Sequence, residues 1–144
     1  MIIKKANLND LKKILDLQKL AYLSEAKLYN DFSIEPLKQN IEAIESEFKK
    51  GIVLKALNDD LKIIGSVRAF KEEDTVFIQK LIVHPDFQNK GIGKSLLESI
   101  ENYFINTYFN IEFKLFTGYK SSKNIYLYEK FKKEKISEKL EFIH

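Results

Sequence analysis

The sequence predicts a mixed α/β domain, in which a mostly antiparallel sheet contains a central parallel strand pair and carries helices on both faces. Three runs rich in apolar and β-branched residues, 52–57, 61–70 and 75–83, are separated only by short turns, as in an antiparallel meander. The third run is followed by a loop, an amphipathic helix and another apolar run at 111–117, which is the order of a parallel crossover. Further amphipathic helical patterns precede the first of these strands, so helices are available for both faces.

Length and composition predict one domain over residues 1–144. A chain of 144 residues can bury a core of its own but is short for two domains. Hydrophobic residues make up 44% and charged residues 31%, a balance typical of folded domains rather than disordered chains. There is no cysteine, which excludes a thiol nucleophile, disulfides and thiolate metal ligands, and no metal site is expected.

The charge pattern predicts neither a nucleic-acid partner nor a membrane partner. The net charge of +3 comes from 24 basic and 21 acidic residues that are mixed along the chain, and Arg68 is the only arginine. The first residues contain no apolar signal segment, and no apolar run approaches the roughly 18 residues of a membrane-spanning helix. The expected location is the cytoplasm.

The N-terminal residues predict a short strand and a first helix. Ile2 and Ile3 begin the strand, and Asn7 with Asp10 three residues later has the spacing of a capping box that starts the helix. Four apolar residues at helical spacing are expected to share its buried face: Leu8, Leu11, Ile14 and Leu15.

A second helix is predicted to begin at Ser33 and Pro36 and to end at Gly51. Its apolar positions repeat at spacings of four, three and four: Leu37, Ile41, Ile44 and Phe48.

Turn-forming residues separate the remaining elements. Asn58-Asp59-Asp60 and the segment 71–74 divide the three meander strands. A long helix from about Gly91 to Tyr108, a last helix at about 123–133 and a final strand beginning at 140 complete the expected elements.

The loop HPDFQNKGIGKS, residues 84–95, indicates a phosphate site. Glycines before a helix leave backbone N–H groups open to an anion. Gly93-Lys94-Ser95 resembles the end of an ATP-binding loop, but that motif needs a glycine where this chain has Gln88. A nucleotide hydrolase or kinase is therefore a minor alternative.

The pattern Gln88-x-x-Gly91-x-Gly93, after the strand end Val83-His84-Pro85, resembles the acetyl-CoA loop of the GNAT superfamily of N-acetyltransferases. A second segment, SSKNIYLYEKF at 121–131, resembles the later family segment in which an asparagine and a tyrosine of one helix approach the cofactor. These two residues are Asn124 and Tyr128. The family usually has Gly-Phe soon after Tyr-Glu-Lys, whereas this chain has Phe131-Lys132-Lys133.

The resemblance implies a GNAT-like fold with a splayed parallel strand pair and acetyl-CoA as cosubstrate. Leu81 and Val83 would offer strand N–H and C=O groups to the pantetheine, and Asn124 would lie near the cofactor. Tyr128 would protonate the departing thiolate. The residues implied to bind the pyrophosphate are Gln88, Asn89, Lys90, Gly91, Ile92, Gly93 and Lys94.

The resemblance also implies an amine acceptor, with a small molecule preferred over a peptide or protein amine. The predicted acceptor residues are Tyr22, Glu25, Tyr29 and Gln79, because carboxylates and aromatic rings suit a cationic amine. Many relatives have a glutamate base on the strand before the loop, where this chain has Gln79. The proton acceptor is left open among four residues: Glu25, Glu72, Glu73 and His84.

Three alternatives stay open at this point. A non-catalytic acyl-CoA-binding sensor would also need the loop and would explain the missing strand glutamate. Arg68 either binds an anionic group of the acceptor or pairs with a surface carboxylate. The sequence leaves a homodimer open.

Overall fold

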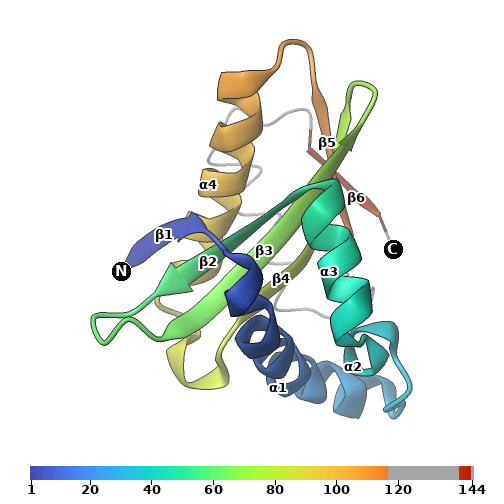
Figure 1. Ribbon diagram of the computed structural model, residues 1–144. Coiled ribbons are helices and arrows are strands. Elements are labelled where there is room, and N and C mark those ends of the chain that lie inside the picture. The colour runs from blue at the N-terminus through green and yellow to red at the C-terminus, as the bar shows by residue number, and fades with distance from the viewer. Residues whose placement is uncertain (117–139, 144) are drawn as a thin grey trace.

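The computed structural model describes residues 1–116 and 140–143, which form the predicted mixed sheet with helices on both faces (Figure 1). The six strands lie in sequence order, and the first four pair antiparallel. β4 and β5 pair in parallel, as predicted, and so do β5 and β6, which the sequence did not indicate. The strands are β1 Ile2–Lys5, β2 Ile52–Leu57, β3 Ile63–Glu72, β4 Thr75–Val83, β5 Glu112–Phe116 and β6 Leu140–Ile143.

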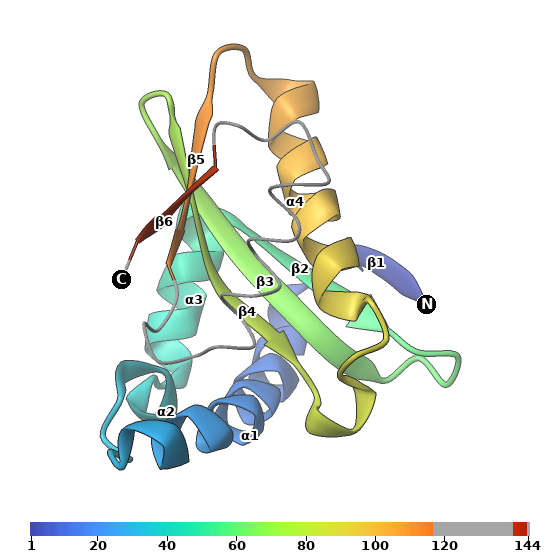
Figure 2. The same cartoon turned by 180° about the vertical axis from the view of Figure 1, so that it is seen from behind.

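Three helices cover one face of the sheet and one long helix covers the other (Figure 2). α1 (Leu11–Tyr29), α2 (Glu35–Lys38) and α3 (Ile41–Lys50) share the first face, and α4 (Ile92–Thr107) packs on the second. Short 3-10 turns, η1 (Leu8–Asp10) and η2 (Pro85–Phe87), precede α1 and α4. The larger core lies under α4, and a smaller one lies under α1 and α3. The predicted helix at 123–133 falls outside the described residues.

The predicted second helix is divided into α2 and α3, so the expectation of one continuous helix was wrong. Gln39 has an extended ψ of 134°, and the Asn40 side chain accepts the Ala43 amide at 2.9 Å as the N-cap of α3. An asparagine can cap a new helix more favourably than it continues an old one. The break also turns Gln39 inward, where its side chain is buried.

The predicted capping contact is present, but it closes a 3-10 turn rather than the first turn of α1. The Asn7 amide donates to the Asp10 carboxylate at 2.7 Å, and Lys55 of β2 donates to the same carboxylate at 2.7 Å. The pull toward β2 explains why the helix begins only at Leu11. Leu8 is 55% exposed, so its assignment to the buried helical face was wrong.

A buried polar network joins the helices of the first face to the sheet. Its centre is Arg68 of β3, which is 1% exposed. The Arg68 guanidinium donates to Glu47 at 2.6 Å, to Gln39 at 3.0 Å and to Gln18 of α1. Gln18 in turn donates to Gln39 and to the Pro36 carbonyl, both at 2.9 Å. The network therefore fixes α1, α2 and α3 against β3 at one point.

Replacing Glu47 with alanine should lower the free energy of unfolding by about 3–5 kcal/mol, because the buried Arg68 would lose its closest counter-ion. Urea denaturation at pH 7 measures this loss. The matched control is Ser46→Ala at an exposed position of the same helix, which should change the free energy by less than about 0.5 kcal/mol. A loss below about 1 kcal/mol for Glu47→Ala, the value of a surface pair, would contradict this account of the network.

Candidate functional site

The strand β4 separates from β5 halfway along its length. Thr75–Ile78 pair in parallel with Glu112–Leu115, and among the residues that the structure describes the pairing stops at Ile78 although β4 continues to Val83. Three stacked rings lie across β3, β4 and β5 just before this point. Phe77 stacks on Phe70 with centroids 5.2 Å apart and on Phe116 with centroids 5.8 Å apart. These contacts hold the strands together up to the place where the gap begins.

A bulge in β4 accounts for the separation. Between the pairs Arg68–Gln79 and Ser66–Ile82, β4 contains one residue more than β3. Lys80 lies within this bulge and has a left-handed φ of 53°, which is uncommon for a residue with a side chain. A bulge bends its strand and increases the local twist, so the second half of β4 turns away from β5.

Leu81 and Val83 direct their backbone groups toward this gap. In an antiparallel ladder, alternate residues bond to the same neighbour. The His84 amide donates to the Ile64 carbonyl of β3 at 2.8 Å, so the N–H and C=O groups of Val83 and Leu81 point to the opposite edge of β4. The Gln88 side chain, which lies 3.4 Å from the Val83 carbonyl, contacts it on that edge.

The loop between β4 and α4 is shaped by its own side chains and glycines. His84 Nδ1 accepts the Asp86 amide at 3.0 Å and fixes η2. Asn89 and Gly91 have left-handed φ values of 62° and 81°. A Cβ at Gly91 would meet no described atom within 4 Å, so glycine is needed there for its backbone conformation. Among the described residues, the space beside Gly91 in front of α4 is open.

The N-terminus of α4 is held close to the sheet. A Cβ on Gly65 of β3 would lie 3.0 Å from Leu96 and 3.2 Å from Ile92, so this glycine permits close packing of the first turns of the helix. The Ile92 side chain is in the core, which leaves only its amide for a ligand. The first amides of a helix have no intrahelical acceptor and form the positive end of its dipole. The amides up to Lys94 therefore suit a diphosphate.

Most of the predicted cofactor residues thus lie along one edge of the molecule. Leu81 and Val83 line the gap, and the segment from Gln88 to Lys94 forms the loop and the helix start. Lys90 is exposed and lies 5.4 Å from the Phe87 ring centroid. Asn124 and Tyr128 lie outside the described residues.

Three of the four predicted acceptor residues lie together on the inner surface of α1. Tyr29 hydrogen-bonds to Glu25, and burial nevertheless raises the pKa of the Glu25 carboxyl above its ordinary value. Burial, with repulsion from Glu25 as a smaller cause, raises the pKa of Tyr22, so its phenol keeps its proton at neutral pH. Gln79 lies on the same face of the sheet, because its neighbour Ile78 is buried under α4.

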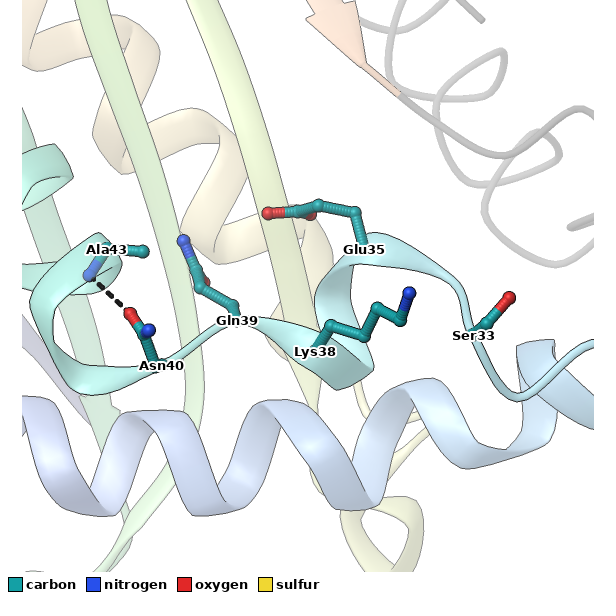
Figure 3. A pocket seen from close by; sticks show the side chains of 6 residues that line it. All are labelled: Ser33, Glu35, Lys38, Gln39, Asn40 and Ala43. Carbon is teal, nitrogen blue, oxygen red and sulfur yellow. Dashed lines mark hydrogen bonds between the residues drawn. The ribbon is translucent and has the colours of Figure 1, made fainter.

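Lys80 connects the bulge to the helices. Its ammonium lies 3.0 Å from a carboxylate oxygen of Glu35 on α2 and 3.7 Å from one of Glu47, and the Lys80 side chain is 9% exposed. Figure 3 shows the Glu35 side chain pointing away from Ser33, beside an open pocket of about 370 Å³. The pocket is lined by Ser33, Glu35, Lys38, Gln39, Asn40 and Ala43.

The surface that carries Tyr22, Glu25 and Tyr29 is called the acceptor face below, because these are predicted acceptor residues. Sequence reasoning missed the polar residues that surround it. These are Gln18, Glu35, Gln39, Glu47 and Lys80. A polar residue within a helical apolar pattern was an available signal for Gln18, which is fully buried on α1. The ion pairs of Lys80 join segments far apart in the sequence, and no local pattern indicates them.

The structure separates the four candidate proton acceptors. Glu72 and Glu73 lie in the β3–β4 hairpin, at the end of β4 opposite the loop. Both are therefore far from Gln79, because roughly 13 Å of strand separates Gln79 from Thr75, the first residue of β4. Glu25 lies on the acceptor face, and His84 lies at the loop end of β4.

Arg68 plays neither of the two roles that the sequence left open. It pairs with a carboxylate, Glu47, but in the interior rather than at the surface. Within residues 1–116 and 140–143, no three acidic or histidine side chains gather in a way that could hold a metal ion. No helix of the described part of the chain has the length and apolar character to cross a membrane.

Comparisons with known proteins agree with this geometry. The model of the acetyltransferase (GNAT) family matches residues 11–132. A mutant of the BH1408 protein from Bacillus halodurans has the same fold, with a TM-score of 0.75, 19% identity and 92% of each chain covered. The PaiA N-acetyltransferase from Thermoplasma acidophilum, solved in complex with coenzyme A, has a TM-score of 0.75 at 20% identity, over 90% of this chain and 86% of that one.

One curated relative is similar in sequence over part of the chain. The UPF0157 protein YqkA from Bacillus subtilis (strain 168) is 28% identical over 89 residues, which are 62% of this chain and 25% of YqkA. The match thus spans about a quarter of that relative. The family model, by contrast, covers most of this chain. This protein belongs to the acetyltransferase (GNAT) family.

Proposed function

We propose that this protein transfers the acetyl group of acetyl-CoA to the nitrogen of a primary amine, with a small molecule as the acceptor. The observation that carries the proposal is the gap beside the second half of β4, next to the N-terminus of α4. An extended pantetheine can pair with the strand groups at the gap while its diphosphate meets the helix amides. The coenzyme A complex of the similarly folded PaiA protein supports this donor.

The donor is held largely by backbone groups. Leu81 and Val83 supply strand N–H and C=O groups, and the amides from Gln88 to Lys94 supply hydrogen bonds to the diphosphate. Gly91 leaves the space in front of these amides open. Lys90 and Lys94 add positive charge at the same end, and the family resemblance adds Asn124, which is outside the described residues, to the donor's partners.

The reaction needs no covalent intermediate on the protein. The neutral amine attacks the thioester carbonyl, the new C–N bond forms, and the C–S bond breaks to release CoA as a thiolate. Tyr128 gives its proton to the sulfur and regains one from solvent. The proton lost from the acceptor nitrogen passes to a base. The products are an amide and free CoA, and this route suits a chain without cysteine.

Glu25 is the proton acceptor in this proposal. Burial raises the pKa of its carboxyl toward neutrality, which improves its strength as a base. Gln79, at the strand position where relatives have a glutamate, cannot take a proton but can hold a water between the acceptor and Glu25.

The same Gln79 favours a second candidate function, an acyl-CoA-binding sensor without catalysis. Release of CoA thiol over a panel of amines separates the two. Turnover supports the enzyme, and tight acetyl-CoA binding without turnover on any amine supports the sensor.

Acetyl-CoA should raise the thermal midpoint, because a ligand that binds only the folded state stabilises it by about 2.7 kcal/mol at a hundred times its Kd. For a chain of this size we expect a rise of several degrees in a thermal shift experiment, at roughly 2–8 °C per kcal/mol. Magnesium-ATP is the control and should have no effect. A rise with magnesium-ATP alone would restore the ATP-loop interpretation of Gly93-Lys94-Ser95.

Gly91→Asn should weaken acetyl-CoA binding by roughly tenfold or more, because a side chain would enter the space kept for the diphosphate. Asparagine tolerates the left-handed backbone better than other residues, so this variant should unfold near the wild-type midpoint. Gly91→Ala is the matched variant, with less bulk but more backbone strain. Isothermal titration measures the Kd. Equal affinity of Gly91→Asn and wild type would mean that the diphosphate does not lie at Gly91.

Tyr128→Phe should lower kcat by on the order of a hundredfold with little change in acetyl-CoA affinity, because only the proton donor to the thiolate is removed. Steady-state thiol release together with the Kd for acetyl-CoA measures both quantities. Tyr126→Phe, two residues away, is the control. An unchanged kcat for Tyr128→Phe would remove this tyrosine from the role of acid.

A further inference from the structure

Charged side chains from five elements gather around the Tyr22 ring of α1. Glu25, Glu35, Glu47 and Arg68 all act on the Tyr22 phenol, and Lys80 bonds to two of these carboxylates. They come from α1, α2, α3, β3 and β4 respectively. Among these five described side chains, three carboxylates and two cations leave one negative charge in excess.

Both cations of this cluster are already neutralised. Arg68 lies 2.6 Å from Glu47 and is 1% exposed. Lys80 lies 3.0 Å from Glu35 and is 9% exposed. A carboxylate on an incoming molecule could reach Arg68 only by displacing Glu47 from a largely buried pair, and breaking such a pair is costly. It could reach Lys80 only in place of Glu35, whose side chain is 63% exposed, and Glu47 would still lie 3.7 Å from that ammonium.

The carboxylate in excess is that of Glu25. Its contact within the described part of the chain is the Tyr29 hydroxyl, and none of the ion pairs formed by the described residues includes Glu25. Tyr22 and Tyr29 are three residues before it and four after it on α1, so both rings flank the carboxylate on the same helical face. A carboxylate between two aromatic rings is suited to an ammonium group.

The C-terminal half of α1 carries Glu25. Gln18, earlier on the same face of the helix, contacts Arg68 of β3. From there α1 runs toward the side of the sheet where β5 and β6 lie, as both ribbon views show (Figures 1 and 2). Among the described residues β5 pairs with β4 only as far as Ile78, so this half of the helix lies toward the side of the sheet on which the gap opens.

We infer that the acceptor is a cationic amine with no carboxylate beside its amino group, and that Glu25, between Tyr22 and Tyr29, binds its ammonium. The inference rests on the proposed acetyltransfer and names its substrate class. Free α-amino acids are poor acceptors, because their carboxylate would meet the excess negative charge and find both cations paired. Lys38, a further cation at the rim of the open pocket, also has a carboxylate nearby. It lowers the pKa of the Asp31 carboxyl, although Ser33 lowers that pKa more.

Matched pairs of acceptors test the substrate class. Tyramine with tyrosine, phenethylamine with phenylalanine, and 3-methylbutylamine with leucine differ only in the carboxylate, and leucinamide controls for its bulk. Thiol release is measured at saturating acetyl-CoA and at a pH where every acceptor is mainly in its ammonium form, the form that Glu25 is inferred to bind. We expect kcat/KM for each amine to exceed that of its amino acid by roughly tenfold or more, with leucinamide closer to the amine. Equal or better turnover of the amino acids would overturn the inference.

Glu25→Gln tests the residue. It should raise KM for the amines by roughly tenfold and leave the Kd for acetyl-CoA unchanged. Because the folded state raises the pKa of Glu25, ionisation of this group opposes folding above its ordinary pKa, and the glutamine variant should have a higher thermal midpoint at pH 7 than wild type. A purely structural role would not combine higher stability with weaker acceptor binding. Glu42→Gln, exposed on α3, is the control and should change none of these values.

The outcomes separate this inference from the acetyltransferase proposal. If the protein binds acetyl-CoA and acetylates amino acids best, or if Glu25→Gln leaves the amine KM unchanged, the inference fails and acetyltransfer stands. If it binds acetyl-CoA but acetylates no member of the panel, the inference also fails and the sensor is favoured. If it does not bind acetyl-CoA, both fail.

Discussion

The bulge at Lys80 is the constraint on which the rest of the site depends. One extra residue in β4 ends the pairing with β5 at Ile78 and leaves the backbone edge at Leu81 and Val83 facing a gap. The same bend brings the strand end to the loop that starts α4, so one continuous segment carries both the strand edge and the helix amides that the proposed donor would need. A straight β4 paired along its whole length with β5 would offer neither.

The bulge is held from one side by ion pairs and from the other by apolar packing. Lys80 has a strained backbone, and Glu35 and Glu47 hold its side chain against α2 and α3. Leu81, the next residue, lies in the core under α4. Strain of this kind, on the order of 1–3 kcal/mol, persists only where surrounding contacts over-determine it. The polar network therefore acts on the geometry of the donor site as well as on the attachment of the helices.

The fold could be predicted from the sequence because its signals are local. The strands of the meander, the loop glycines and α4 each follow from residues a few positions apart, and the order of these elements indicates the pairing as far as β5. The division between α2 and α3 was missed because the apolar spacing across Leu37 and Ile41 stays helical, while the break depends on Asn40 as a cap and on buried partners of Gln39. The proposed donor site rests on local signals of the same kind. The acceptor face was only partly predictable, since Glu35, Glu47 and Lys80 meet through tertiary contacts.

A charged network lies under α2 and α3, where an apolar core would also pack. The acceptor face that the network borders gives a reason for this. Buried ion pairs are often no more stabilising than apolar replacements of the same size. An apolar contact, however, would neither fix the direction of the Lys80 side chain nor neutralise the carboxylates of Glu35 and Glu47 near Tyr22. With Arg68 and Lys80 both paired, Glu25 is the carboxylate of this cluster that forms no ion pair among the described residues. Burial of the Glu25 charge lowers the free energy of unfolding, and an incoming ammonium would offset this cost by pairing with the carboxylate.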